Sequence, residues 1–175
     1  VQADDWRLFA VIDALGHGPD AQRSAQAVAE ALAQAGGEPL SRVFERAHVA
    51  LRGLRGVVMS AVLVQGREVS FAGVGNVEIF APEGATRPVA FAGTLGSGAY
   101  RFRPFSLQLA RGQRWVLASD GIKVRVASAL LPKLKHESPE AAADALLSQA
   151  TRPHDDASVL VLDIEDTPPE GAAVP

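Results

Sequence analysis

Four aspartates of this 175-residue chain lie next to apolar segments, at positions where carboxylates can bind metal ions. Asp13 and Asp120 each follow an apolar run, and the pair Asp155 and Asp156 precedes one. Carboxylate oxygens are hard ligands that suit Mg2+ or Mn2+. Two such ions can bind a water between them and convert it to a hydroxide at neutral pH, and that hydroxide could attack a phosphorus atom in line. Spacing alone does not show that the acids meet, so acids that only serve turns are an equal alternative.

The first of these acids stands directly before a glycine-containing turn. In the segment Val11–Ala21, VIDALGHGPDA, Gly16 and Gly18 could let the backbone approach a phosphate at the N-terminus of a helix. Turn geometry alone would also explain both glycines. His17 is a candidate donor of a proton to a leaving seryl oxygen, but a turn histidine near the site is the interpretation that we favour.

The composition excludes several other kinds of site. The chain has no cysteine, which excludes disulfides, thiolate metal sites and a cysteine nucleophile, and which agrees with a cytoplasmic location. A net charge of -3 gives no general reason to expect nucleic-acid binding, and no apolar run approaches the length of a membrane span. A nucleotide phosphohydrolase has little support, because the chain has no Gly-x4-Gly-Lys-Ser/Thr loop.

The periodicity of the apolar residues predicts the elements that must position these acids. Strands are expected at Trp6–Asp13, Val57–Val64, Val69–Val74, Val77–Ala81, Arg87–Phe91, Phe102–Leu109, Gln113–Ser119 and Ala157–Ile164. Helices are expected at Pro19–Ala35, Pro39–Leu51, Ile122–Leu131 and Pro139–Ala150. The strands from Val57 to Phe91 are expected to form a meander, and Phe102–Leu109 is expected to pair with Gln113–Ser119. Because the helices cluster instead of alternating with strands, the order favours an α+β fold with antiparallel sheets.

The chain is expected to form one domain over residues 1–166, followed by a flexible tail over residues 167–175 that is rich in Pro, Gly and Ala. Ala3–Asp5 is expected to form a turn. A further strand is expected upstream of Val1, so that this domain lacks its first strand.

Several segments together resemble a known family. The motifs occur in the order seen in SpoIIE-like phosphatases, bacterial members of the metal-dependent PPM class: DALGHGPDA, RGVVMSAV, GVGNVEIF, GTLG, ASDGI and HDDASVLVL. The resemblance extends to about Asp163 and includes the compact stressosome phosphatases of this family. It implies a four-layer α-β-β-α sandwich of two antiparallel sheets flanked by helices, with metal ions in a cleft at one sheet edge.

The resemblance also implies roles for the acids, with two divalent cations, Mn2+ or Mg2+, as cofactors. Asp13 would bridge both ions, and the backbone carbonyl of Ala14 would bind one of them. Asp120 and Asp155 would bind the other ion, and Asp156 would support that shell.

The chain departs from the family pattern in two respects. The family usually has Asp-Gly where this chain has Asp13 and Ala14, and the backbone angles required there could disfavour alanine. A Gly-Asp on the family's first strand, and the phosphate-binding arginine of the wider class, would both precede Val1. Arg55 matches an Arg-Gly of the family and could contact the substrate phosphate, although a structural ion pair is at least as well supported.

Other polar residues are expected to be structural. Gly73, Gly75 and Asn76 are expected to form a bulge or a tight crossing beneath the site without a catalytic role. Ser119 is expected to donate or accept a hydrogen bond beside Asp120, and His48 is expected to pack on a helix.

The leading hypothesis is a protein phosphatase that removes phosphate from phosphoserine or phosphothreonine. The resemblance points to substrates in partner-switching pathways, either STAS-domain regulators or stressosome proteins. The alternative is a catalytically weakened module that binds a phosphoprotein or regulator without efficient turnover. The Ala14 departure favours this alternative, whereas the presence of all four aspartates argues against it.

Overall fold

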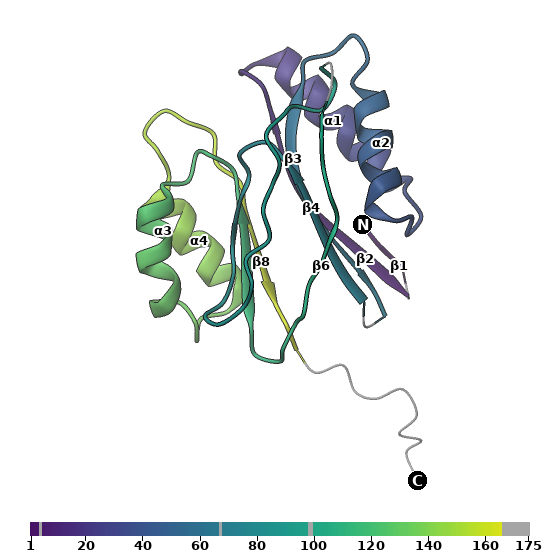
Figure 1. The fold of residues 1–175 in the computed structure, drawn as a ribbon. Coiled ribbons are helices and arrows are strands. Elements are labelled where there is room, and N and C mark those ends of the chain that lie inside the picture. The colour runs from purple at the N-terminus through teal and green to yellow at the C-terminus, as the bar shows by residue number, and fades with distance from the viewer. Residues whose placement is uncertain (4, 67, 98–99, 166–175) are drawn as a thin grey trace.

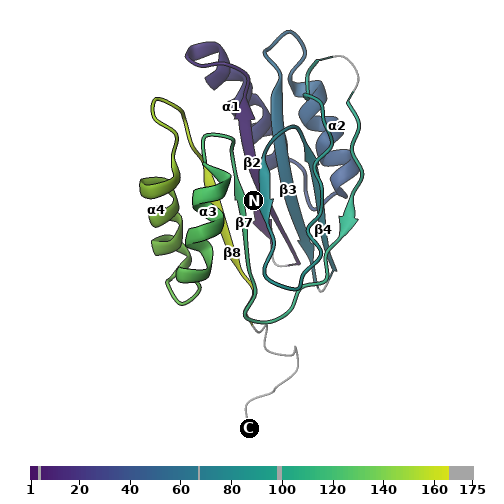
Figure 2. The same ribbon diagram turned by 60° about the vertical axis from the view of Figure 1, so that its left-hand side comes forward.

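The computed structural model describes residues 1–3, 5–66, 68–97 and 100–165, which form two facing β-sheets with helices on their outer sides (Figure 1). The first sheet has the strand order β1 (Gln2–Ala3), β2 (Trp6–Ala14), β3 (Val57–Gln65), β4 (Glu68–Val74) and β6 (Phe105–Ser106). The second sheet has the order β5 (Glu78–Phe80), β7 (Arg114–Ala118) and β8 (Val159–Asp163). Helices α1 (Pro19–Ala33) and α2 (Leu40–Ala50) cover the first sheet, and α3 (Val124–Leu130) and α4 (Pro139–Ala150) cover the second (Figure 2). The predicted four-layer α-β-β-α sandwich is confirmed.

The helix boundaries follow from local chemistry. Helix α1 begins with Pro19, whose fixed φ suits the first helical position and whose missing N–H has no helical partner to lose there. Ser138 caps α4, because its hydroxyl accepts a hydrogen bond of 3.2 Å from the main-chain N–H of Ala141. The helix predicted at Ile122–Leu131 is divided into α3 and a 3-10 turn, η1 (Leu131–Lys133).

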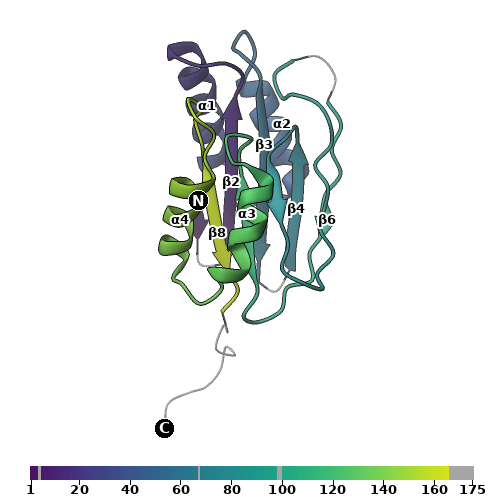
Figure 3. The same ribbon diagram turned by 90° about the vertical axis from the view of Figure 1, so that its left-hand side faces the viewer.

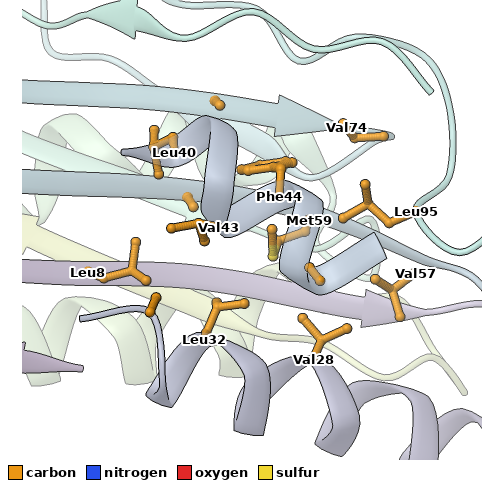
Figure 4. Packing of buried hydrophobic residues seen from close by; sticks show 14 of the residues in the cluster. Leu8, Val28, Leu32, Leu40, Val43, Phe44, Val57, Met59, Val74 and Leu95 are labelled. Atoms are coloured by element: carbon orange, nitrogen blue, oxygen red, sulfur yellow. The ribbon is translucent and has the colours of Figure 1, made fainter. Parts of the chain in front are cut away.

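Helices α1 and α2 pack on the first sheet through a continuous apolar cluster (Figure 4). Phe44 of α2 and Met59 of β3 are fully buried in this cluster, which also contains Leu8 of β2 and Val28 of α1. Strand β3 is buried over most of its length, because the helices cover one face and the second sheet covers the other. This central strand therefore fixes β2 and β4 on either side of it.

The side chains of β2 alternate between the two faces of the first sheet. Leu8 and Ile12 pack toward the helices, whereas Phe9 and Val11 pack toward the second sheet. Asp13 continues the second series, so its carboxylate lies at the end of the layer between the two sheets.

The chain crosses between the sheets, so the predicted pairing of Phe102–Leu109 with Gln113–Ser119 is wrong. Phe102–Leu109 contributes only β6, which pairs with β4, and Gln113–Ser119 contributes β7, which pairs with β5 and β8. Both faces of β7 are apolar. Leu117 packs toward the first sheet and Val116 packs toward α3 and α4. The strand therefore needs a packing layer on each of its two faces.

Two further expectations also differ from the structure. Arg87–Phe91 forms no strand in the described part of the chain, and Phe91 makes only an isolated bridge to Val74. The turn predicted at Ala3–Asp5 is wrong at its first residue, because Ala3 belongs to β1 and pairs with Trp6. The tail predicted over residues 167–175 lies outside the described residues.

The connections that follow β2, β4 and β7 lie at one end of the sandwich, the upper end in Figure 1. The loop that leads from α4 into β8 reaches the same end, and Figure 3 shows α3 and α4 in front of β8 as seen from their side. These connections carry the residues of the candidate site.

Candidate functional site

The register of the second sheet brings the site residues of three chain segments to one edge. Ala118, the last residue of β7, pairs with Glu78 at the start of β5 and with Val159 at the start of β8. Asp120 follows β7 by two residues, and Asp156 precedes β8 by three. Asp120 therefore lies just after β7 and Asp156 just before the neighbouring strand β8, so both acids are at the same end of these two strands.

Asn76 connects this edge to the first sheet. Its side-chain amide donates a hydrogen bond of 2.7 Å to the Asp120 carboxylate. Gly75, which precedes it, has a φ of 98° and packs so closely on Val58 that a Cβ would lie 2.2 Å from that side chain. Of the two predicted alternatives, a bulge or a tight crossing, the structure shows the tight crossing, but sequence reasoning missed the contact of Asn76 with Asp120. The sequence signal that could have indicated this contact was an amide side chain directly after the glycine that follows a strand.

The loop that carries Asp120 is attached to the loop that carries Asp155 and Asp156. The Arg152 main-chain N–H donates to the Gly121 carbonyl at 2.7 Å, and the Arg152 guanidinium Nε donates to the Asp120 main-chain carbonyl at 2.8 Å. These bonds fix the distance between the two acidic loops through their backbones.

Gly121 and Ser119 also hold the Asp120 loop close to the loop that carries Asp155 and Asp156. A Cβ on Gly121 would lie 2.0 Å from the Asp156 carbonyl oxygen, so only glycine fits between the two loops. Ser119 is buried, and its hydroxyl accepts a hydrogen bond of 3.0 Å from the Ser158 main-chain N–H. The serine next to Asp120 is thus a structural hydrogen-bonding residue, as expected.

The electrostatics show that the four acids converge. Burial, followed by the neighbouring carboxylates of Asp120, Asp155 and Asp156 in that order, raises the pKa of Asp13 from 3.8 to about 6. Asp13 also lies within hydrogen-bonding reach of Asp120. Asp13 is half-buried and the other three are exposed. The structure therefore brings all four predicted metal-site aspartates into one electrostatically coupled cluster.

The donor set fits divalent cations, since it consists of carboxylate and carbonyl oxygens only. Among the described residues, however, no three or more His, Asp or Glu side chains are already close enough together to share one ion. The neighbouring carboxylates disfavour the ionised form of Asp13, and a divalent cation would offset that repulsion.

The glycine turn after β2 is shaped by two positive φ angles. Gly16 and Gly18 have φ values of 81° and 83°, a region that other residues rarely adopt. A Cβ on Gly16 would lie 2.5 Å from the Arg55 guanidinium, so this arginine lies directly against the turn. Arg55 also makes a long ion pair of 3.4 Å with Asp20, in which both side chains are exposed.

A comparison with protein families gives a decisive match over almost the whole chain. The family described as Stage II sporulation protein E (SpoIIE) matches residues 4–165. This chain belongs to the SpoIIE family.

Relatives of this SpoIIE-family chain include phosphatases of known structure. The phosphoserine phosphatase RsbX of Bacillus subtilis (strain 168) is 26% identical over 130 residues, which are 71% of this chain but only 65% of RsbX. A chain from a structure described as "The bacterial stressosome: a modular system that has been adapted to control secondary messenger signaling" is 29% identical, with a TM-score of 0.80 over 92% of this chain and 86% of that one.

Two metal-containing structures share the fold at lower identity. RsbX in complex with magnesium has a TM-score of 0.80 and 22% identity, covering 92% of this chain and 82% of that one. The catalytic domain of the serine threonine protein phosphatase PstP in complex with two manganese ions has a TM-score of 0.77 and 19% identity, covering 95% and 94%.

The alanine that replaces the usual glycine of the SpoIIE family is accommodated without strain. Ala14 is the last residue of β2 and pairs with Val57. His154 is the one non-glycine residue with a positive φ in the described part of the chain, so Ala14 has ordinary strand geometry. The concern that the backbone angles would disfavour alanine is therefore wrong.

The histidines differ in how firmly they are placed. His17 is exposed in the glycine turn. His48 accepts a hydrogen bond of 3.1 Å from the Gly96 main-chain N–H and packs against Tyr100 with ring centroids 4.6 Å apart and planes tilted by 32°, which confirms its packing role. No helix within the described ranges is long and apolar enough to cross a membrane.

Proposed function

We propose that this SpoIIE-family chain hydrolyses phosphoserine and phosphothreonine on a partner protein with the help of two divalent cations, Mn2+ or Mg2+. The observation that carries the proposal is the convergence of four aspartates from three chain segments at one end of the sandwich. The family membership and the similarity to RsbX, which is named a phosphoserine phosphatase, support the same reaction.

The four acids and one carbonyl would divide the ions between them. Asp13 would contact both ions, the Ala14 carbonyl would contact one, and Asp120 and Asp155 would contact the other, with Asp156 in support. When bound, the ions supply positive charge for the phosphoryl group and activate the attacking water. In the net reaction a P–O bond to water forms, the P–O bond to the seryl oxygen breaks, and serine leaves with a proton.

The remaining residues of the site would act on the substrate and on the acids. Asn76 and the Arg152 guanidinium orient Asp120, one through its carboxylate and the other through its main-chain carbonyl. The main-chain N–H groups of the turn with Gly16 and Gly18 and the guanidinium of Arg55 would contact phosphate oxygens. His17 would donate the proton to the seryl oxygen.

The substrate would be a phosphorylated regulator of a partner-switching pathway, either a STAS-domain protein or a stressosome protein, in the cytoplasm. The similarity to RsbX and to the chain from the stressosome structure supports this class of substrate. A weakened module that binds such a partner without turnover is the second candidate. The assay below separates this candidate from an enzyme.

A phosphate-release assay on a phosphoseryl peptide tests the proposal. We expect release that depends on Mn2+, that is lost in Asp13→Asn, and that persists in the control Asp144→Asn, which changes an exposed acid on α4. Unchanged release by Asp13→Asn would contradict the proposed site. Absence of both release and calorimetric Mn2+ binding would favour the non-catalytic module.

A further inference from the structure

Two large apolar side chains are exposed in loops beside the acidic cluster. Leu15, in the turn between β2 and α1, is 47% exposed, and Leu54, in the turn between α2 and β3, is 38% exposed. Single exposed leucines are common on protein surfaces and by themselves indicate nothing. These two differ because the loops that carry them are joined to one another and to the site.

Main-chain and side-chain contacts join the two loops. The Leu15 main-chain N–H donates to the Gly56 carbonyl at 3.0 Å, and a Cβ on Gly56 would lie 3.4 Å from the Leu15 side chain. The guanidinium of Arg55, the residue that follows Leu54, lies 3.5 Å from the Leu15 carbonyl oxygen. We refer to Leu15, Leu54 and Arg55 as the apolar rim.

Contacts of the neighbouring Gly56 with a second segment of the chain also hold the apolar rim in place. Gly56 packs on the Leu95 carbonyl and on Thr94 so closely that a Cβ would lie 2.9 Å from the carbonyl oxygen. Leu95 in turn exchanges two main-chain hydrogen bonds with Val57, the first residue of β3. A surface that is fixed before binding loses little conformational entropy when a partner docks on it.

The charge of the rim matches a phosphorylated or acidic segment. The ion pair of Arg55 with Asp20 is long, at 3.4 Å, and Asp20 is shared with Arg23, which lies closer to it at 2.5 Å. The single bond to this carboxylate leaves guanidinium N–H groups of Arg55 without a partner among the described residues. An anionic ligand can occupy them.

The position of the rim defines which part of a substrate reaches it. Leu15 follows Asp13 by two residues, which is about 7 Å along an extended chain. We infer that the apolar rim is the docking surface for the protein substrate, and that it binds an extended segment with a large apolar residue two to four positions from the phosphoserine. This inference rests on the proposed function, because it places the phosphoserine at the acidic cluster.

Binding and turnover of matched peptides test the inference. One peptide carries leucine three residues from the phosphoserine on either side, and the other carries asparagine there. Binding is measured by fluorescence polarisation with Mn2+ present, using versions in which a non-hydrolysable phosphonate replaces the phosphate. Burial of the exposed half of a leucine predicts that the wild-type protein prefers the leucine peptide about fivefold, in affinity and in kcat/KM.

Two variants assign the preference to the rim. Leu54→Ser should remove the fivefold preference and should lower kcat/KM for the leucine peptide relative to kcat/KM for p-nitrophenyl phosphate. The control Leu147→Ser makes the same change at a 36% exposed position on α4 and should leave the preference intact.

The outcomes separate this inference from the proposed function. Equal affinity for the two peptides, or no measurable binding of either, overturns the docking surface even when p-nitrophenyl phosphate is hydrolysed. A leucine preference that is lost in Leu54→Ser establishes the docking surface even when no phosphate is released, a result that would refute the phosphatase proposal alone.

Discussion

Replacement of Asp13 by asparagine should stabilise the protein at neutral pH when divalent cations are removed with EDTA. The pKa of Asp13 is raised from 3.8 to about 6, first by burial and then by Asp120, Asp155 and Asp156. At about 1.4 kcal/mol per pH unit, ionising this carboxyl in the folded chain costs about 3 kcal/mol. Because the side chain is only half-buried, solvent screening reduces the cost to about 1–2 kcal/mol.

The sign of the pH dependence follows from the raised pKa of Asp13. Below about pH 3 the carboxyl is protonated in the folded and unfolded chains alike, and it costs nothing. As the pH rises from about 4 to 6 the unfolded chain releases its proton first, so the folded state loses stability until its own carboxyl ionises. Asparagine does not ionise, so its advantage should be complete above about pH 7 and should fall to about a third at pH 4.5.

Urea unfolding followed by circular dichroism, in EDTA at several pH values, measures this difference. At pH 7.5 we expect Asp13→Asn to gain about 1–2 kcal/mol in free energy of unfolding, or about 3–6 °C in melting temperature. The control Asp144→Asn changes an exposed acid outside the cluster and should show no such gain. Excess Mn2+ should raise the melting temperature of the wild-type protein but not that of Asp13→Asn. A variant that is no more stable than the wild type at pH 7.5, or whose gain does not change with pH, would refute the reasoning.

Three further substitutions test the contacts around the cluster. Asn76→Ala removes the amide that orients Asp120 and should weaken Mn2+ binding about tenfold in calorimetry. Gly121→Ala places a methyl group 2.0 Å from a carbonyl oxygen of the α4–β8 loop, so it should lower both the melting temperature and the affinity for Mn2+. Arg114→Ala breaks a bidentate pair with Asp163, with bonds of 2.6 and 2.5 Å, and should lower the free energy of unfolding by about 2 kcal/mol in urea denaturation without changing Mn2+ affinity.

The expectations for Gly121→Ala and Asn76→Ala each have a contrary result. Gly112→Ala is the matched control for Gly121→Ala, because a Cβ there meets no atom within 4 Å while its φ of 73° still strains alanine. It should destabilise the fold but leave Mn2+ binding unchanged. Equal Mn2+ affinity in Gly121→Ala and Gly112→Ala would show that the close contact between the two loops does not position the acids. Wild-type affinity in Asn76→Ala would show the same for the amide.

The helices and most strands could be predicted from the sequence, because apolar periodicity is a local property. The 3.6-residue spacing around Val28 and Phe44 and the continuous apolar run that contains Met59 each identify an element without knowledge of its neighbours. The partner of a strand is not a local property. Nothing near Trp115 shows that β7 pairs with β5 and β8 in a second sheet and not with the segment before it.

The acids of the candidate site were found from the sequence, whereas their orienting partners were not. Asp13 and Asp120 are recognisable because each ends an apolar strand. The contact between Asn76 and Asp120 joins residues that are far apart in the sequence, and it depends on the register that places β5 beside β7. A pattern along one segment contains no information about such a contact.

The energetics of the cluster bear on the choice between an enzyme and a weakened module. In the absence of cations, a half-buried Asp13 that faces three other carboxylates makes the folded chain less stable by about 1–2 kcal/mol at neutral pH. The surrounding structure nevertheless keeps the acids together, through the Asn76 amide, the Arg152 guanidinium and the close contact at Gly121. Divalent cations would convert this repulsion into attraction. A fold that holds four mutually repelling acids at one end of the sandwich is therefore explained better by a site that binds cations than by a weakened module.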